Sequence, residues 1–361
     1  MKIQAVELYA YQIPLDPPLC IQKKIITNRD GFIIRLTSKE GFSGIGEIAP
    51  LPGFQQDSPA DFIKQFPEIR NWLLSKDFFP EITRLNGILS KDLESLNLMP
   101  SVQFGLESAL LQLSASANKK PIYKELSESI TRNLMLAGLV HADKPDVFRK
   151  VTALYNRGFR TIKIKVGVQD INDDIRCIRE LHKLTEKKIK FRIDANRSWQ
   201  IEEAVFFANE IKYCYPDFIE EPINDPRLLI EFVYITQMPV GLDESLSFFY
   251  PDIYWAKALV IKPAVIGNLD TVNQYIKFAN QTRKLAIISD TYLTAVGLTM
   301  EMALAAALIK NPAAMGFGTY GAMREDVVPL RIIGENNTVN VLKAVSALNT
   351  LNFNNLQKMT C

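Results

Sequence analysis

The sequence predicts an α/β protein in which a closed barrel of parallel strands follows a mixed α+β region. The main observation is an alternation of short apolar runs and amphipathic segments that begins near residue 130. Alternating strand and helix units favour a parallel sheet, and eight such units favour a closed barrel over an open sheet. The second observation is size, since 361 residues suffice for one barrel and an attached smaller domain.

The region before residue 100 is predicted to contain both strands and helices. Apolar residues at helical spacing predict an amphipathic helix over residues 60–74. Pro67 lies inside this helix and is expected to kink or split it. The remaining predictions are strands at 3–13 and 31–36, loops rich in glycine and proline at 41–53, and a long helix at 101–117.

The repeated region contains eight predicted strands. Apolar runs predict them at 134–140, 161–166, 189–194, 218–220, 240–243, 258–261, 285–289 and 314–316. Helices are predicted between most of them, at 146–156, 172–185, 201–213, 227–236, 269–282 and 296–309. Ser198 is expected to cap the N-terminus of the third helix. Beyond residue 326, short strand-like pieces are expected to pack against the N-terminal region.

The composition excludes several classes of protein. The chain has 42 Lys and Arg against 40 Asp and Glu, a net charge of +2, which is unlike a protein that binds nucleic acid or an anionic membrane. Four distant cysteines form no CxxC pair, which excludes a zinc knuckle and a thioredoxin-type site. The first residues carry no apolar signal segment and no apolar stretch is long enough to span a bilayer, so we expect a cytoplasmic protein.

The chain has only two histidines, His141 and His182. A histidine-rich zinc site and a Ser-His-Asp triad are therefore disfavoured, and acid–base chemistry should depend on Lys, Asp or Glu. Both histidines are interpreted as surface or core residues. The GxGxxA segment at 44–49 is interpreted as a loop, because Pro50 and Pro52 prevent the long helix that would hold a pyrophosphate.

Charged residues recur where the predicted barrel strands end. Lysines lie on strands two and six, and carboxylates end strands three, four and five: Lys163, Lys165, Asp194, Glu220, Asp243 and Lys262. The carboxyl ends of barrel strands converge on one mouth, so these side chains are expected to meet. Three carboxylates form an oxygen site suited to Mg²⁺. A lysine beside a divalent cation and a second lysine loses its proton more readily and can act as a base.

Each charged residue alone also has a structural explanation. A single Asp or Glu after a strand usually caps a helix or faces solvent, and a KxK pair usually lies on the surface. Five charged positions in successive units, in an order that suits one mouth, favour the catalytic interpretation.

Together these segments resemble the enolase superfamily, in its muconate-lactonizing subgroup. The similar segments are the KxK strand at 161–167, three metal-binding segments at 192–199, 218–222 and 241–245, and a second lysine segment at 260–267. The loop at 46–54 is similar to the lid loop of the o-succinylbenzoate synthase family within this superfamily.

The resemblance implies a (β/α)₇β modified TIM barrel with an α+β capping domain. Residues 1–100 would form the N-terminal capping domain, 101–325 the barrel with the catalytic site, and 326–361 a segment that completes the cap. The implied reaction is Mg²⁺-dependent dehydration of 2-succinyl-6-hydroxy-2,4-cyclohexadiene-1-carboxylate to 2-succinylbenzoate, a step of menaquinone biosynthesis, with Mn²⁺ able to substitute. The partner is a small-molecule carboxylate.

The resemblance also implies a role for each site residue. The metal ligands would be Asp194, Glu220, which is preferred to the adjacent Glu221, and Asp243. Lys165 would remove the α-proton and then protonate the departing hydroxyl, Lys262 would remain cationic on the opposite face, and Lys163 would favour the neutral form of Lys165. Asn196 and Glu244 would orient these groups, and the substrate contacts would include Ser289, Gly318 and Thr319.

Two departures from relatives bear on the substrate. Many relatives carry a Glu on strand seven where this chain has Leu293, beside Ser289 and Asp290. Dipeptide epimerases usually carry a DxD motif on strand eight, whereas this chain has Gly-Phe-Gly-Thr-Tyr at 316–320. An N-acylamino-acid racemase or a cycloisomerase remains an alternative, since both lysines are present. A barrel that only binds a carboxylate is a further alternative.

Overall fold

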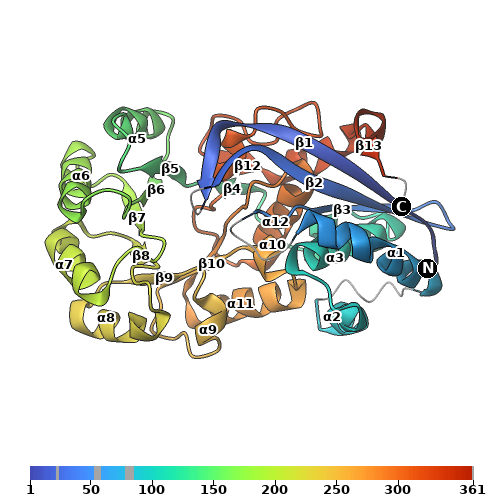
Figure 1. Cartoon of the computed structure of the whole chain (residues 1–361), viewed down its shortest axis with the longest axis horizontal. Helices are drawn as coiled ribbons and strands as arrows, with labels where there is room; N and C mark the ends of the chain where they lie inside the picture. Colours follow the sequence, from blue (N-terminus) through green and yellow to red (C-terminus); the bar gives the residue numbers. More distant parts are fainter. Residues whose placement is uncertain (22–23, 53–57, 78–84, 360–361) are drawn as a thin grey trace.

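The computed structural model describes residues 1–21, 24–52, 58–77 and 85–359, and an antiparallel sheet lies at one side of the molecule (Figure 1). The order of its strands is β13-β1-β2-β3. The strands are β1 (Ile3–Ile21), β2 (Lys24–Ser38), β3 (Ser43–Ile48) and β13 (Gln357–Lys358). β13 pairs with β1, so the C-terminal tail returns to the N-terminal region as the sequence predicts. The proposed domain boundaries near residues 100 and 325 stay a prediction.

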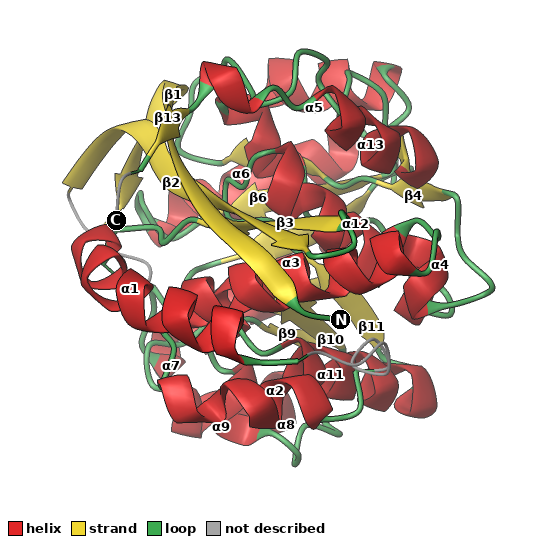
Figure 2. Ribbon diagram, turned by 90° about the vertical axis from the view of Figure 1, so that its right-hand side faces the viewer, coloured by secondary structure: helices red, strands yellow, loops and turns green. Residues whose placement is uncertain are grey.

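The strand β3 lies within residues 41–53, where the sequence analysis predicted only loops, and that prediction is wrong. The glycines of β3 serve close packing against α3 (Pro100–Ala117) rather than a turn. A Cβ at Gly44 would lie 2.1 Å from the Ala109 carbonyl oxygen, and one at Gly46 would lie 1.9 Å from the Gly105 carbonyl oxygen. In Figure 2, β2 and β3 lie across α3 and α12 (Ala295–Leu308).

The helix α1 (Pro59–Ser75) continues through Pro67, so the predicted split does not occur. Buried residues on both sides of the proline belong to one core, and this shared burial holds the two halves together. These residues are Phe62, Phe66, Ile69 and Leu73. The short helix α2 (Ile88–Leu93) and the 3₁₀ turn η2 (Glu94–Leu96) precede α3.

The barrel contains a sheet of parallel strands in the order β11-β10-β9-β8-β7-β6-β5, which confirms the predicted fold class. The strands are β5 (Gly138–His141), β6 (Thr161–Lys165), β7 (Lys190–Asp194), β8 (Phe218–Glu220), β9 (Val240–Leu242), β10 (Ala258–Ile261) and β11 (Leu285–Ile288). Every residue of β8, β9 and β10 is buried. A parallel sheet covered on both faces requires such apolar strands.

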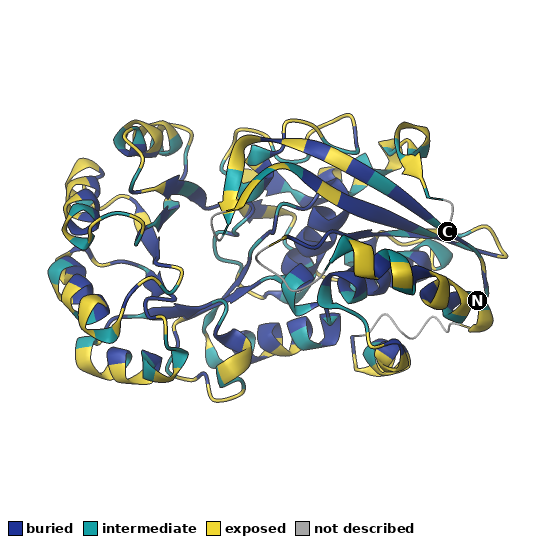
Figure 3. Ribbon diagram, in the orientation of Figure 1, coloured by how far each residue is buried: buried dark blue, intermediate teal, exposed yellow. Residues whose placement is uncertain are grey.

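Helices follow most barrel strands and present their polar faces to solvent (Figure 3). The outer helices are α5 (Val147–Asn156), α6 (Ile171–Leu184), α7 (Ile201–Ile211), α8 (Leu229–Thr236), α11 (Leu269–Thr282) and α12. Shorter helices are α4 (Ile122–Leu126), α9 (Leu246–Phe249), α10 (Pro263–Ile266) and α13 (Val341–Ala347). The 3₁₀ turns are η3 (Lys212–Cys214), η4 (Pro226–Leu228), η5 (Gly318–Ala322), η6 (Leu348–Thr350) and η7 (Phe353–Asn355).

The predicted eighth strand, 314–316, forms bridges instead of a regular strand. The Gly316 N–H donates to the Ile288 carbonyl at the end of β11. On the other side, the Ala137 N–H donates to the Met315 carbonyl just before β5. These hydrogen bonds connect the two edges of the parallel sheet and close the barrel.

The predicted first barrel strand, 134–140, is divided in two. Its beginning forms β4 (Asn133–Met135), which pairs antiparallel with β12 (Thr338–Asn340) of the tail. Only β5 joins the parallel sheet. The strand is divided because the backbone of β4 pairs with β12, whereas the backbone of β5 pairs with β6. Buried N–H and C=O groups each need such a hydrogen-bond partner.

The N-cap prediction for the helix after β7 is wrong. Gln200 is the N-cap of α7, and Glu203 completes a capping box with it. The Ser198 hydroxyl instead donates to the Ala195 carbonyl at 2.5 Å, inside the loop that leaves β7. Among the described residues, no helix combines the length and the apolar character that crossing a bilayer requires.

Candidate active site

The charged residues of β6, β7 and β8 face one another because the strands run parallel in register. Lys165 is paired with Asp194, and Asp194 with Glu220. Lys163, two residues before Lys165, faces the same side of the sheet. Its Nζ lies 2.8 Å from Asp194 Oδ2 and 2.7 Å from Glu220 Oε1. Both carboxylates are buried, so a single ammonium group holds them together at the mouth.

The next two strands add a second ion pair to this mouth. Asp243 follows β9 and Lys262 follows β10, and the Lys262 ammonium is ion-paired with Asp243 Oδ2. Both side chains are nearly inaccessible to solvent. The charge of Asp243 also raises the pKa of Glu220, and the charge of Lys262 lowers it. The structure therefore brings together all six charged residues that the sequence analysis selected.

Burial and charge oppose each other at these groups. Burial and the charge of Asp194 raise the pKa of Glu220, which Lys163 only partly offsets. Burial would also raise the pKa of Asp194, but Lys163 and Lys165 lower it below its ordinary value. Burial would lower the pKa of Lys163, but the two carboxylates raise it. The mouth thus concentrates negative charge that requires cations.

Asn196 connects the proposed base to a proposed metal ligand. Lys165 Nζ donates to Asn196 Oδ1 at 2.9 Å, and the Asn196 N–H donates to Asp194 Oδ1 at 3.0 Å. Asn196 has a φ of 44°, a left-handed conformation that asparagine tolerates better than most residues. Glu244 is half-buried beside Asp243, and burial followed by the Asp243 charge raises its pKa to about 7.

Glu221 faces away from the charged cluster and organises the neighbouring loops. Its Oε1 accepts the N–H groups of Asp243 at 2.9 Å and Ser245 at 2.8 Å. Its Oε2 accepts the Ser245 hydroxyl at 2.7 Å and Arg197 Nε at 3.0 Å. Glu221 is fully buried and has a φ of 42°. It connects the loops after β7 and β9, a function that the sequence analysis missed because neighbouring glutamates look alike in sequence.

The donor set suits a hard cation, although the side chains are not grouped as a ready-made ion site. Within the described ranges, no three acidic, histidine or cysteine side chains form such a group. Lys163 and Lys262 supply the positive charge among the carboxylates. In the same described part of the chain, the buried Glu244 Oε2 has no hydrogen-bond donor, whereas Asp194 Oδ2 lies 2.8 Å from the Lys163 ammonium. Buried carboxylate oxygens gathered at one mouth fit Mg²⁺, which prefers oxygen ligands.

The residues predicted on strands seven and eight lie where the barrel closes. Ser289 bridges to Gly316, and the Thr319 hydroxyl donates to Asp290 Oδ2 at 2.5 Å. A Cβ at Gly318 would lie 3.3 Å from Leu139 Cβ on β5. Leu293 is fully buried, so it contributes packing and no polar group. The structure therefore places Ser289, Gly318 and Thr319 together, but on the side of the mouth away from β7 and β8.

Arg29 connects the antiparallel sheet to the loop predicted as a lid. This arginine of β2 is 1% exposed, and its guanidinium donates to the carbonyls of Ala49, of Pro50 at 2.7 Å and of Tyr292 at 2.9 Å. The contacts join β2, the start of the lid loop and the loop after β11. The last predicted lid residues, 53–54, lie outside the described residues. Nothing in the local sequence distinguishes Arg29 from Arg35 of the same strand, so the sequence analysis had no signal for this contact.

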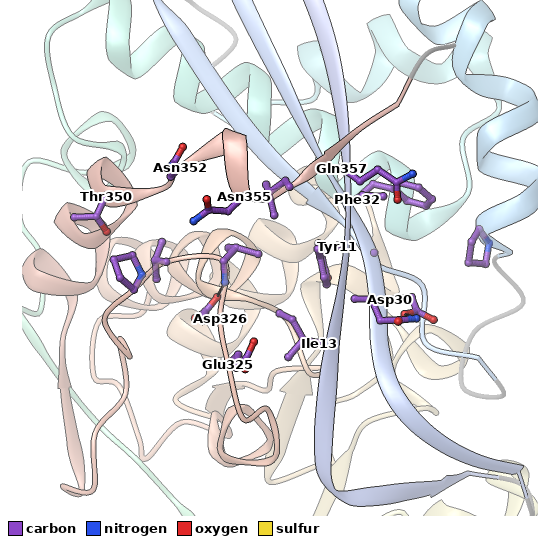
Figure 4. A pocket seen from close by; sticks show the side chains of 18 residues that line it. Tyr11, Ile13, Asp30, Phe32, Glu325, Asp326, Thr350, Asn352, Asn355 and Gln357 are labelled. Carbon is purple, nitrogen blue, oxygen red and sulfur yellow. Dashed lines mark hydrogen bonds between the residues drawn. The ribbon is translucent and has the colours of Figure 1, made fainter.

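A separate hollow of about 870 Å³ lies between β1, β2 and the C-terminal tail (Figure 4). None of the predicted site residues lines it. Asp30, Glu325 and Asp326 contribute carboxylates, and the described residues around it include no lysine, arginine or histidine. This surplus of negative charge does not suit a carboxylate substrate, so the charged mouth of the barrel is the better candidate.

Two family models match the chain. Residues 146–344 match the enolase C-terminal domain-like family, and residues 3–113 match the MenC N-terminal domain. Among curated relatives, o-succinylbenzoate synthase of Pasteurella multocida is 28% identical over 84% of this chain and 86% of its own length. That of Yersinia pseudotuberculosis is 29% identical, over 90% and 93%. The chloroplastic protein PHYLLO of Arabidopsis thaliana is 28% identical over 91% of this chain, which spans 21% of that longer protein.

Solved structures share the fold at low sequence identity. The L-Ala-D/L-Glu epimerase of Bacillus subtilis superposes with a TM-score of 0.82 at 24% identity, covering 94% of this chain and 96% of its own. An N-succinyl Arg/Lys racemase of Bacillus cereus gives 0.82 at 15% identity over 100% of both chains. A dipeptide epimerase of Enterococcus faecalis, solved with Mg and a dipeptide, gives 0.81 at 21% identity, over 94% and 97%.

Proposed function

The chain belongs to the enolase C-terminal domain-like family, and from this premise we propose that it is a Mg²⁺-dependent lyase of the o-succinylbenzoate synthase type. The substrate would be 2-succinyl-6-hydroxy-2,4-cyclohexadiene-1-carboxylate and the product 2-succinylbenzoate. The observation that carries the proposal is the convergence of three buried carboxylates with lysines on both sides of them. The MenC N-terminal domain match and the two bacterial relatives named above favour this substrate over others.

Asp194, Glu220 and Asp243 would hold the metal ion. When bound, Mg²⁺ acts as a Lewis acid that stabilises negative charge on the substrate carboxylate. The three carboxylates end adjacent strands of one parallel sheet, so the backbone register already directs them to the same mouth. Glu221 supports this arrangement by holding the backbone N–H of Asp243.

Lys165 is suited to the role of base. Its side chain is 33% exposed, so it can reach a substrate in the mouth, and Asn196 orients its Nζ. The C–H bond next to the substrate carboxylate breaks, and Lys165 takes the proton. The C–O bond of the ring hydroxyl then breaks, Lys165 returns the proton to the departing oxygen, and water leaves as the ring becomes aromatic. One base on one face of the substrate is enough for this sequence.

Lys262 is suited to the role of a fixed cation. It is only 11% exposed and ion-paired with Asp243, whereas Lys165 is more accessible. A held ammonium group near the substrate carboxylate stabilises the negative charge that develops there. The different surroundings of the two lysines favour an unequal division of roles.

An N-acylamino-acid racemase is the second candidate, since lysines flank the carboxylates on both sides and a racemase needs a base on each face. The N-succinyl Arg/Lys racemase shares the fold. The purified protein should be assayed with Mg²⁺ and the cyclohexadiene acid, and in parallel with N-acylamino acids for racemisation and α-proton exchange. Dehydration well above the uncatalysed rate supports the lyase. Racemisation without dehydration supports the racemase, and the absence of both activities and of exchange supports a carboxylate-binding barrel.

The metal assignment has its own test. Asp194→Asn and Asp243→Asn should each weaken Mg²⁺ binding in calorimetry and abolish turnover, because each removes a charged ligand. Glu180→Gln, a change at an exposed position of α6, is the matched control. Unchanged metal affinity and activity in both Asp variants would refute the assignment.

A further inference from the structure

His141, which the sequence analysis interpreted as a structural residue, lies at the end of β5 beside the proposed base. In the parallel register of β5 and β6, Leu139 is paired with Lys163 and His141 with Lys165. Neighbouring strands lie about 4.8 Å apart. His141, Lys165, Asp194 and Glu220 therefore form one row across four adjacent strands.

The packing of β5 shows which side of the strand His141 faces. A Cβ at Gly138 would lie 2.7 Å from Leu154 Cδ1 of α5, so this position faces the outer helices. Val140 faces the same way and is buried. Since side chains alternate along a strand, Leu139 and His141 face the interior, as do Lys163 and Lys165. The position of Gly318 next to Leu139 agrees with this orientation.

His141 lies on the side of Lys165 that is opposite the carboxylates. The proposed metal ligands follow β7, β8 and β9, whereas β5 is on the other side of β6. This is also the side where the barrel closes and where Ser289, Gly318 and Thr319 lie. A substrate with its reacting carboxylate at the metal ligands and its α-carbon at Lys165 would extend the rest of its structure toward His141.

The imidazole is available to a ligand. His141 is exposed at the mouth, and in the described part of the chain its ring makes no hydrogen bond. Partial burial and the charge of Lys165 lower the pKa of His141. An uncharged imidazole offers one N–H donor and one acceptor nitrogen. It is therefore equipped to bind an oxygen acceptor that lies away from the metal ligands.

We propose that His141 is a substrate-binding residue that donates a hydrogen bond to an acceptor oxygen on the substrate tail, the part remote from the reacting carboxylate. This inference rests on the proposed function, because 2-succinylbenzoate carries such a tail, with a ketone and a second carboxylate. The same geometry selects acids with an acyl chain that ends in an oxygen acceptor over acids without one.

The test compares two ligands in three variants. Binding of 2-succinylbenzoate and of benzoate, which lacks the tail, is measured by calorimetry with Mg²⁺ for wild type, His141→Leu and His141→Gln. His141→Leu should weaken 2-succinylbenzoate binding about 3- to 10-fold, the range expected for one hydrogen bond, and leave benzoate binding unchanged. His141→Gln keeps an N–H donor and should recover part of the affinity. In turnover, KM should rise while kcat changes less than about twofold.

His182→Leu is the matched control. His182 lies near the C-terminal end of α6, which returns the chain to the start of β7 and so to the opposite end of the barrel from the charged mouth. This variant should bind both ligands as wild type does. Equal weakening of both ligands by His141→Leu, no weakening of either, or loss of kcat without a change in KM would overturn the inference.

Failure of the proposed function gives a different result. If the wild-type protein racemises N-acylamino acids and does not dehydrate the cyclohexadiene acid, the lyase proposal is wrong. The variants are then compared on N-succinyl and N-acetyl amino acids, and the inference requires a selective loss for the N-succinyl compound. Equal effects on both would overturn it, as would a wild-type protein that binds no ligand of either series.

Discussion

Replacing Glu221 by glutamine tests whether this carboxylate, rather than Glu220, organises the loops at the mouth. The variant keeps the size of the side chain, and its remaining carbonyl oxygen can still accept the N–H groups of Asp243 and Ser245. The new amide group, however, takes the place of Oε2, where it faces Arg197 Nε. Two donors would then face each other in a fully buried position.

The expected cost follows from these contacts. A hydrogen bond to a charged group contributes about 1.5–3 kcal/mol, and a donor left without an acceptor adds to the loss. The Arg197 side chain is 31% exposed, so water can hydrate its guanidinium when the ion pair with residue 221 is lost. Loss of this ion pair therefore costs less free energy than loss of a fully buried one. We therefore expect the free energy of unfolding to fall by about 2–3 kcal/mol.

Urea denaturation followed by circular dichroism measures this change, with Glu180→Gln as the exposed control. The control should differ from wild type by less than ~0.5 kcal/mol, as is usual for surface substitutions. A Glu221→Gln variant within ~0.5 kcal/mol of wild type would refute the reasoning, because the four contacts of the carboxylate would then contribute no net stability.

Three further predictions address the base, a buried acid and a strand. Lys165→Ala should reduce turnover by at least ~10²-fold, since general base catalysis contributes roughly 10²–10⁴-fold. Lys262→Arg keeps a cation and should retain part of the activity. Steady-state rates in which Lys165→Ala is the more active variant would contradict the division of roles. Burial raises the pKa of Glu107 to about 7, so the folded chain retains this proton at a pH where the unfolded chain has lost it. Relative to Glu107→Gln, wild type should therefore lose up to ~3 kcal/mol of unfolding free energy as the pH rises from about 4.5 to about 7. If the unfolding free energies of the two proteins change in parallel with pH, Glu107 does not have this raised pKa. Gly46→Ala should lower the unfolding free energy by more than ~3 kcal/mol or prevent folding, because its Cβ would meet a backbone carbonyl. The control Gly321→Ala places its Cβ in open space and should be nearly neutral. Similar melting temperatures for the two variants would show that the close packing at Gly46 does not limit stability.

Several sequence predictions failed at positions where a distant segment determines the local structure. The glycines of β3 suggested a loop, but they form a strand because α3 packs directly on them. Residues 314–316 suggested a strand, but their hydrogen bonds form separate bridges to the two edges of the sheet. Ser198 suggested a helix cap, but it bonds within its own loop. In each case the local residue types are compatible with more than one structure.

The order of charged residues along the chain was sufficient to predict the candidate site. Lys165, Asp194 and Glu220 are separated by about one strand–helix unit each, and a parallel barrel brings the ends of successive strands to one mouth. This periodic geometry converts spacing in sequence into proximity in space, so no knowledge of the packing was needed. The fold class followed from the alternation of strand and helix patterns, and the grouping of the six charged residues followed from this rule.

Only the tertiary structure decided which neighbouring residue faces the site and which residues outside the pattern join it. Glu220 enters the charged cluster while Glu221 bonds to loop backbone, a choice made by strand register and by the N–H groups within reach. His141 faces the interior because Gly138, three residues earlier, packs against α5. Arg29 reaches the loop after β11 from a distant strand. Side-chain direction and long-range contacts depend on the surrounding packing, which spacing along one chain does not contain.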